Sequence, residues 1–239
     1  MASVSRLFID APLGPGLSVE LSRDHAHYLF GVMRRREGDR VDLFNGRDGA
    51  WSSRVVDAGK RGGLLELQEM VQPQRDPPDV WLLFAPIKKA RTDFIVEKAA
   101  EMGAARICPV RTDHTNSERV RQDRLQAHAV EAAEQCGGTF VPPVDPLSPL
   151  SSRLDDWPQD RRLLFCDEAL VGRADSFPDE AGPWAILIGP EGGFSDAERA
   201  RLATMPQAHA VSLGPRILRA DTAAVAALTL WQQHLGDWR

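Results

Sequence analysis

The stretch WAILIGPEGGFSDAE, residues 184–198, decides the fold of the second part of the chain, because three structural signals follow one another in it. It opens with a continuous apolar run, which is typical of a strand buried on both faces of a parallel sheet. The Gly189-Pro190 step disfavours helix, and Gly192-Gly193 permits positive φ and close approach of a ligand to the backbone. Ser195–Glu198 has the S-x-x-E spacing of a capping box. We predict a strand, a glycine loop and a helix N-terminus whose free N–H groups can hold polar or anionic groups.

A second loop of this kind lies at residues 212–223, SLGPRILRADTA, after an apolar stretch. It enters a helix for which Asp221 or Thr222 can serve as the N-cap. Arg216 and Arg219 flank two apolar residues, and this alternation suits a pocket with apolar walls and a guanidinium at its mouth. The helix continues AAVAAL, and because small side chains let another backbone come close, we expect it to be tightly buried or at a subunit interface.

Around these loops, apolar runs alternate with helical segments over residues 79–239. The expected strands are VWLLFAP, ARICPV, RLLFCD, WAILIG and HAVSLG, and the expected helices cover about residues 89–102, 119–135 and 221–234. This alternation indicates an α/β fold with a parallel sheet. Ligands of such sheets bind beyond the carboxyl ends of the strands, where both loops lie. Neither loop has the GxGxxG or the Walker pattern.

Residues 1–72 have a different pattern, with five short apolar stretches separated by turn signals. One helical piece, about residues 25–34, interrupts them. Several short strands with frequent turns suggest a small β-barrel. Residues 73–78 contain three prolines, which cannot continue a central strand or a helix interior, so we read them as a linker between two domains.

The formal net charge of the chain is −5, which gives no overall electrostatic attraction to a nucleic acid. Any polyanion must therefore be bound by local patches rather than by a global field. Two basic clusters are present, Arg34-Arg35-Arg36 and the group formed by Arg119, Arg121 and Arg124.

Other sequence features exclude several classes of protein. No apolar run reaches the roughly 18 to 20 residues that span a bilayer, and the N-terminus does not resemble a secretory signal. The three cysteines are far apart and form no CxxC, which argues against a disulfide framework and a zinc site; we expect three buried thiols, no metal and a cytoplasmic location. His114, in RTDHTN, is a candidate site residue on a loop.

The two loops carry a resemblance to a known family. GPEGGFSDAE followed by SLGPRILRADTA resembles the signature of the RsmE family, uridine-N3 methyltransferases of small-subunit (16S) ribosomal RNA within the SPOUT superfamily. RLFID and HAHYLFGVMRRREGDRVDLFNGRDGAW resemble the family's N-terminal PUA-like barrel. KKARTDFIVEKAAEMGAARICPV and EAAEQCGGTFVPPV resemble parts of its methyltransferase domain, so the likeness spans the chain.

The resemblance implies an architecture and a set of partners. A PUA-like β-barrel at residues 1–72 helps to hold RNA, and a SPOUT-type domain at residues 79–239 threads its C-terminal segment into a deep trefoil knot. The knot's loops bind S-adenosylmethionine in a bent form, and the enzyme is a homodimer with its site near the dimer interface. The sequence departs from the family twice: residues 136–139, CGGT, stand where an arginine is common, and Asp221 replaces a glutamate.

Methylation at uridine N3 sets the roles that we assign to residues. The N3 proton must leave before or during attack on the sulfonium methyl, so the enzyme must align the base, stabilise negative charge on the ring and accept a proton. We expect Arg219 to stabilise the anionic uracil and Glu191 to orient the base or take the proton. The expected cofactor contacts are Gly189, Gly193, Leu213, Gly214, Ile217 and Leu218. The expected RNA contacts are Arg34, Arg35, Arg36, Arg119, Arg124, Glu134 and Gln135.

Two alternatives to this function stay open. One is a knotted methyltransferase with another RNA target, such as a ribose 2′-hydroxyl or a tRNA base. The other is a non-catalytic RNA-binding module that has kept the fold. The PUA-like half favours the uridine-N3 enzyme over the first alternative, and the intact glycine-rich loops argue against the second.

Overall fold

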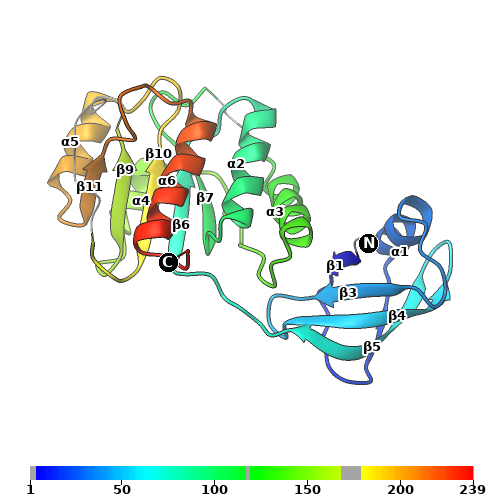
Figure 1. The fold of residues 1–239 in the computed structure, drawn as a ribbon. Helices are drawn as coiled ribbons and strands as arrows, with labels where there is room; N and C mark the ends of the chain where they lie inside the picture. The colour runs from blue at the N-terminus through cyan, green and yellow to red at the C-terminus, as the bar shows by residue number, and fades with distance from the viewer. Residues whose placement is uncertain (1–3, 117–118, 168–178, 239) are drawn as a thin grey trace. The chain divides into compact units, whose positions relative to one another are not determined.

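The computed structural model describes residues 4–116, 119–167 and 179–238 (Figure 1). The chain forms two compact units, and each contains two stretches of sequence. The first unit comprises Met1–Asp76 and Ala133–Val141, and the second comprises Pro77–Ala132 and Pro142–Arg239. The N-terminal unit therefore includes residues 133–141, a segment that the sequence had assigned to the C-terminal domain.

The N-terminal unit is built on a five-stranded sheet. Its elements are β1 (Ser5–Phe8), β2 (Ser18–Glu20), α1 (Arg23–Ala26), η1 (His27–Val32), β3 (Arg40–Phe44), β4 (Ala50–Ala58) and β5 (Gly63–Gln72). The strand order is β1-β3-β4-β5-β2, with β1 parallel to β3 and the other pairs antiparallel. The helical piece begins as expected near residue 25, where Ser22 caps α1 by accepting from the His25 N–H at 3.2 Å, but it continues as the π-helical turn η1. Apolar residues from every strand and from the helical piece, Leu29 among them, form the core.

Residues 133–141 pack against this sheet through specific contacts. The Phe8 N–H in β1 donates to Glu134 Oε1 at 2.9 Å, and the Arg6 guanidinium donates to the Gly138 carbonyl at 2.7 Å. The Arg75 N–H donates to Thr139 Oγ1 at 3.0 Å. Phe44 and Ala133 are buried in one small apolar cluster. These contacts connect the strand β1 and the residues before Asp76 to a segment more than sixty residues further along the chain.

The C-terminal unit contains an all-parallel six-stranded sheet (Figure 1). Its elements are β6 (Val80–Phe84), α2 (Lys89–Glu101), β7 (Arg106–Arg111), α3 (Gln122–Cys136), β8 (Ser148–Pro149), α4 (Leu150–Asp155), β9 (Arg162–Cys166), β10 (Trp184–Ile188), α5 (Asp196–Thr204), β11 (Ala208–Val211) and α6 (Ala220–His234). The strand order is β11-β9-β10-β6-β7-β8. The five predicted strands and three predicted helices are confirmed, with ends shifted by a few residues. The sequence did not predict β8 and α4, which lie in and just after a proline-rich stretch that reads as a loop.

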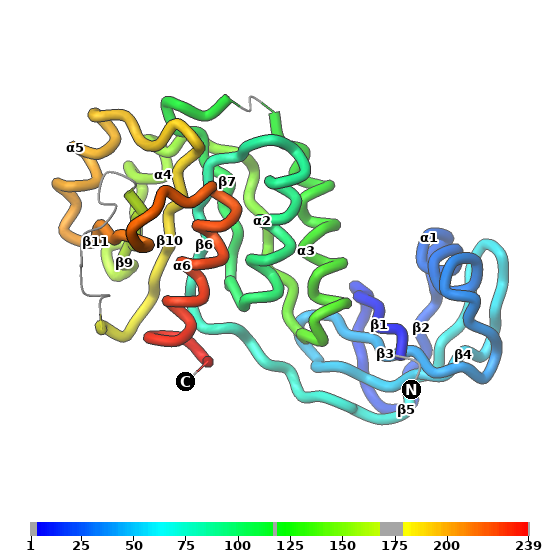
Figure 2. Tube along the Cα trace, turned by 45° about the horizontal axis from the view of Figure 1, so that its top comes forward, coloured from blue at the N-terminus to red at the C-terminus, as the bar shows by residue number. Residues whose placement is uncertain are grey.

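Helices cover both faces of the parallel sheet. Leu83, Leu163 and Leu187, from three different strands, share one apolar cluster with residues of α4 and α5. On the opposite face α6 packs against β10 and lies beside α2 (Figures 1 and 2). The small residues Ala224 and Ala227 of α6 are buried, as the AAVAAL pattern predicted. The central strands are thus covered on both sides, which is why their sequences are continuously apolar.

The three cysteines are free thiols in different surroundings. Burial raises the pKa of Cys108 in β7 and of Cys166 at the end of β9 to about 12. Cys136 is exposed and Cys166 is partly exposed, so the prediction of three buried thiols was right only for Cys108. Cys136 is the last residue of α3, and the next residue, Gly137, has a φ of 78° that ends the helix.

Two further properties concern only the residues in the described ranges. Within them, no helix is both long and apolar enough to cross a membrane. In the same ranges, no three histidine, cysteine, aspartate or glutamate side chains are grouped so as to hold a metal ion.

Candidate functional site

A pocket lies at the carboxyl ends of three neighbouring strands, β9, β10 and β11, where ligands of open parallel sheets bind. It brings together the two glycine loops that the sequence singled out. The lining residues are Cys166, Asp167, Ile188, Gly189, Pro190, Glu191, Val211, Leu213, Arg216, Ile217, Leu218, Ala220 and Ala223. The pocket therefore has apolar walls, two carboxylates and one guanidinium.

Four of the six residues predicted to contact the cofactor line this pocket: Gly189, Leu213, Ile217 and Leu218. Ile217 is 75% exposed, although it is a large apolar side chain, and this leaves an apolar surface open to a ligand. The other two predicted residues, Gly193 and Gly214, do not line the pocket. Both have positive φ, 67° and 112°, and they shape the two loops instead.

The candidate catalytic residues are placed differently from each other. Glu191 lines the pocket and is exposed. Arg219 is the N-cap residue of α6, with an exposed side chain, and it does not line the pocket although its neighbours Leu218 and Ala220 do. Arg216 supplies the guanidinium of the pocket wall.

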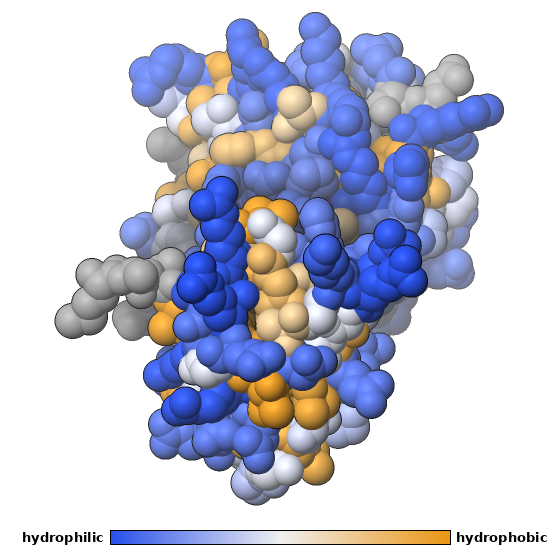
Figure 3. All heavy atoms as spheres, turned by 90° about the vertical axis from the view of Figure 1, so that its right-hand side faces the viewer, coloured by the Kyte–Doolittle hydropathy of each residue, from blue (hydrophilic) through white to orange (hydrophobic). Residues whose placement is uncertain are grey.

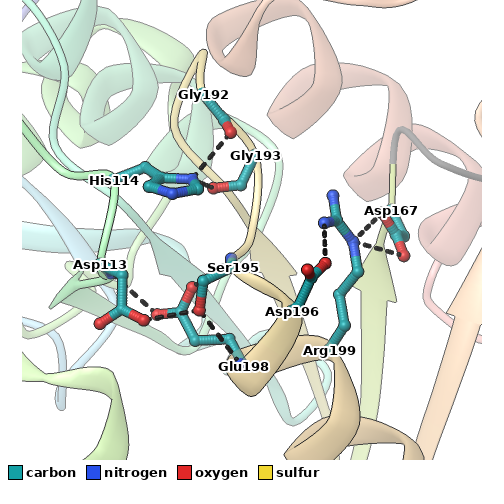
Figure 4. A network of polar contacts seen from close by, with 9 residues as sticks. All are labelled: Asp113, His114, Asp167, Gly192, Gly193, Ser195, Asp196, Glu198 and Arg199. Carbon is teal, nitrogen blue, oxygen red and sulfur yellow. Dashed lines mark hydrogen bonds and ion pairs between the residues drawn. The ribbon is translucent and has the colours of Figure 1, made fainter.

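The loop that follows β7 contacts the turn at Gly192 and Gly193 (Figure 4). The Gly193 N–H donates to the Pro190 carbonyl at 2.9 Å, which closes the turn. His114 Nδ1 lies 2.9 Å from the Gly192 carbonyl oxygen and 3.2 Å from that of Gly193. The candidate site residue on the β7 loop thus contacts the glycine loop directly.

A capping box starts α5 next to this turn, as the SDAE spacing predicted. Ser195 Oγ accepts from the Glu198 N–H at 3.2 Å, and Glu198 Oε2 accepts from the Ser195 N–H at 2.9 Å. Asp113 joins the box from the β7 loop, because its N–H donates to Glu198 Oε1 at 3.0 Å and its carboxylate accepts from the Ser195 hydroxyl at 2.5 Å (Figure 4). Two loops that are about eighty residues apart in sequence are therefore joined by several hydrogen bonds.

Cys166 and Asp167 also line the pocket, although the sequence did not single them out. Burial raises the Cys166 pKa to about 12, so this thiol stays protonated at neutral pH. The Asp167 carboxylate forms an ion pair with Arg199 of α5, with 3.2 Å between Nε and Oδ1 (Figure 4). Both residues end the predicted strand RLLFCD, so the position of ligands at the carboxyl ends of strands was a signal that could have identified them.

The start of α6, which borders the pocket, is joined to α2 by an ion pair. Arg91 Nη1 lies 3.3 Å from Asp221 Oδ2. Asp221 Oδ1 also accepts from the Thr222 N–H at 3.0 Å. An aspartate at this position is thus long enough to reach an arginine on the neighbouring helix.

The predicted RNA contacts divide between the two units. Arg34, Arg35 and Arg36 follow η1 in the N-terminal unit, directly after two exposed apolar residues, Val32 and Met33. Arg34 has a φ of 55°, which is uncommon for a residue other than glycine. Arg35 Nε donates to Ser5 Oγ at 3.0 Å. Figure 3 shows a face on which hydrophilic residues border a strip of apolar ones.

Two predicted RNA contacts, Arg119 and Arg124, lie together in the C-terminal unit. They line a groove at the starts of α2 and α3, together with Lys89 and Arg121. Arg124 forms an ion pair with Asp93 of α2.

The last two predicted RNA contacts, Glu134 and Gln135, belong to the N-terminal unit. Gln135 is exposed. Glu134 accepts the Phe8 N–H, so its side chain takes part in packing the segment 133–141.

Comparison with protein families identifies both domains. Residues 74–232 match the family described as RNA methyltransferase domain, and residues 21–68 match the RNA methyltransferase PUA domain. The prediction of a PUA-like domain followed by a methyltransferase domain with a parallel sheet is thereby confirmed.

Individual relatives are similar along nearly the whole chain. The ribosomal RNA small subunit methyltransferase E of Rickettsia conorii is 28% identical, covering 94% of this chain and 93% of the relative. The protein of the same name from Mycobacterium bovis is 30% identical, covering 92% and 88%. A crystal structure of the Neisseria gonorrhoeae protein bound to S-adenosylmethionine has a TM-score of 0.91 at 27% identity, covering 99% of this chain and 100% of that one. The chain belongs to the ribosomal RNA small subunit methyltransferase E family.

Proposed function

We propose that this protein transfers a methyl group from S-adenosylmethionine to N3 of a specific uridine in small-subunit (16S) ribosomal RNA. The observation that carries the proposal is the pocket that joins the GPE loop after β10 to the LGPRIL loop after β11. Related proteins of Neisseria gonorrhoeae and Legionella pneumophila, each 27% identical to this chain, bind S-adenosylmethionine in their crystal structures.

The lining of the pocket fits the chemistry of S-adenosylmethionine. The cofactor carries a sulfonium and an ammonium, which suit the carboxylate of Glu191, and a carboxylate, which suits the guanidinium of Arg216. Leu213, with its apolar neighbours on the same loop, gives a surface against which an adenine ring can pack. Gly193 and Gly214 act through the shape of the loops rather than by contact.

S-adenosylmethionine supplies an electrophilic methyl group, and the protein has to prepare the uridine. The target base must be unstacked from its neighbours to reach a pocket at the end of the sheet. Arg219, on the loop that enters α6, stabilises the negative charge that develops on the uracil ring as the N3 proton leaves. Glu191, at the pocket, orients the base or takes its proton.

Local basic patches hold the RNA, because the net charge of −5 gives no overall attraction to a polyanion. Arg34, Arg35 and Arg36 serve in the PUA domain, and Arg119 and Arg124 serve in the groove at the starts of α2 and α3. Glu134 and Gln135 add polar contacts. The protein works in the cytoplasm as a homodimer, with the segment that includes the second loop threaded into a trefoil knot and the site near the dimer interface.

Methyl transfer tests the proposal directly. Labelled S-adenosylmethionine is supplied with purified small ribosomal subunits that lack the modification, and with the same RNA stripped of protein. Label recovered as N3-methyluridine supports the reaction and shows which substrate form is recognised. Label on a ribose 2′-hydroxyl or on tRNA assigns another target, and tight cofactor binding without transfer to any RNA refutes the reaction.

Variants then test the assigned roles. Arg219→Ala is expected to lose most of its turnover while it still binds S-adenosylmethionine; Arg201→Ala, which removes a guanidinium from α5 that does not line the pocket, is the control. Full turnover in Arg219→Ala rules out its role. Retained activity in Glu191→Gln removes Glu191 as the proton acceptor.

A further inference from the structure

The imidazole of His114 joins the loop after β7 to the turn at Pro190–Gly193. The ring comes from a different strand end than the turn, and its Nδ1 points at two consecutive carbonyl groups, those of Gly192 and Gly193 (Figure 4). The same turn carries Glu191, and its residues 189–191 form one wall of the pocket. His114, which does not line the pocket itself, therefore contacts a turn that does.

The partners of Nδ1 fix the tautomer of this histidine. A backbone carbonyl can only accept a hydrogen bond, so Nδ1 must carry the proton and donate it. In the neutral ring, Nε2 is then unprotonated. The hold on the turn depends on a donor at the Nδ1 position and makes no use of Nε2.

The backbone around His114 is itself held in place. The Thr115 N–H donates to the Thr112 carbonyl at 3.1 Å, and the Thr112 N–H donates to Thr115 Oγ1 at 2.9 Å. Asp113 is hydrogen-bonded to the capping box of α5. The ring therefore stands on a fixed loop, which is what a residue needs in order to position another element.

The lack of a side chain at Gly192 leaves room for His114. A Cβ on residue 192 would stand 3.2 Å from the His114 Cβ, tighter than most such contacts. The absence of a side chain at this position lets the ring approach until Nδ1 reaches both carbonyls.

We propose that His114 is a positioning residue that holds the Pro190–Gly193 turn, and through it Glu191, against the cofactor pocket. The inference deepens the proposed function and rests on it for the identity of the ligand. One solvent-exposed hydrogen bond shifts an equilibrium by about two- to tenfold, so loss of the donor is expected to weaken S-adenosylmethionine binding by that factor.

Substitutions that move the donor test the proposal. Asn places an amide N–H near the position of Nδ1, whereas Gln places it near Nε2, so the two variants form a matched pair. We expect His114→Asn to bind S-adenosylmethionine within about twofold of the wild type, and His114→Gln and His114→Ala to bind about two- to tenfold more weakly. Titration calorimetry measures the affinities, and thermal unfolding checks that each variant is folded.

Turnover separates positioning from direct chemistry. If His114 acts through Glu191, its replacement by Ala lowers kcat less in a Glu191→Gln background than in the wild type, because the two substitutions remove one function. Additive losses overturn the proposal. So does a His114→Asn variant that binds the cofactor normally but has lost turnover, since that result assigns the function to Nε2.

Hydrogen exchange of the Gly193 amide tests the bracing without any ligand. This N–H donates to Pro190 and closes the turn, so we expect faster exchange in His114→Ala than in the wild type and near-normal exchange in His114→Asn. Equal exchange rates in all variants overturn the proposal. If the variants show the expected exchange rates but the wild-type protein transfers no methyl group to ribosomal RNA, the proposed reaction is refuted and the positioning role of His114 still stands.

Discussion

Breaking the ion pair between Arg91 of α2 and Asp221 of α6 should loosen the edge of the cofactor pocket. The two side chains are 32% and 20% exposed, so the pair is largely shielded from water. Asp221 lies in the first turn of α6, where a negative charge also interacts favourably with the helix dipole. Ala220 and Ala223 of the same turn line the pocket, which couples the ion pair to the site.

The size of the effect follows from the distance and the burial. Two unit charges 3.3 Å apart attract by about 5 kcal/mol at an effective dielectric constant of about 20. Desolvation and ordering of both side chains offset most of that attraction, and about 1–2 kcal/mol remains, between the values for exposed and buried pairs. We expect Asp221→Ala to lower the free energy of unfolding by this amount and to weaken S-adenosylmethionine binding by up to about tenfold, which corresponds to 1.4 kcal/mol.

A double-mutant cycle isolates the pair. Urea unfolding of Arg91→Ala, Asp221→Ala and the double variant gives the coupling energy, and calorimetry gives the cofactor affinity of each. The pair formed by Arg121 and Asp123 is the matched control, because its side chains are 78% and 68% exposed and solvent screening should leave little measurable coupling between them. A coupling for Arg91 and Asp221 no larger than the control, or unchanged cofactor affinity in all variants, refutes the reasoning.

Three other predictions concern stability and reactivity. Hydrogen bonds from a backbone N–H and an asparagine lower the Asp48 pKa, so the stabilisation by its carboxylate is present above about pH 4 and is lost as the pH falls through the lowered pKa. Asp48→Asn should therefore unfold at a lower urea concentration than the wild type at pH 7. A difference in urea midpoint that stays constant down to pH 2 contradicts this prediction. Gly49→Ala should cost at least about 2 kcal/mol in unfolding free energy, because φ is 77° and the Cβ would lie 2.4 Å from a carbonyl oxygen; Gly16→Ala, at similar φ with open space, should cost less. Iodoacetamide at pH 8 should modify Cys136 well before Cys108 and Cys166, whose pKa values of about 12 keep them protonated; mass spectrometry would contradict this by finding equal rates.

The elements that the sequence predicted well are those specified by local chemistry. A strand covered on both faces must be apolar throughout, so WAILI could be recognised without knowing its neighbours. The capping box at Ser195 and Glu198 depends on residues three apart, and the structure contains both of its hydrogen bonds. The rule that ligands bind at the carboxyl ends of parallel strands placed both loops at one pocket.

The features that the sequence did not reveal depend on contacts between distant residues. Nothing near Glu134 in the sequence indicates that its carboxylate accepts the N–H of Phe8, 126 residues earlier. The contact between His114 and the glycine turn spans 78 residues, and the sequence shows only a histidine on a loop. The sequence places Arg216 and Arg219 on either side of the same two apolar residues, but only the fold decides that Arg216 lines the pocket while Arg219 begins α6 beside it.

The membership of residues 133–141 in the N-terminal unit changes how this protein can be divided or recombined. The proline-rich segment at 73–78 looks like the place to cut, yet a fragment that starts at residue 79 keeps Ala133 and Val141 without the phenylalanines they pack against. An isolated N-terminal fragment would leave the Arg6 guanidinium and the Phe8 N–H without their partners. A chimaera that exchanges this unit between two relatives therefore has to exchange residues 1–76 and 133–141 together, because the two stretches fold as one unit.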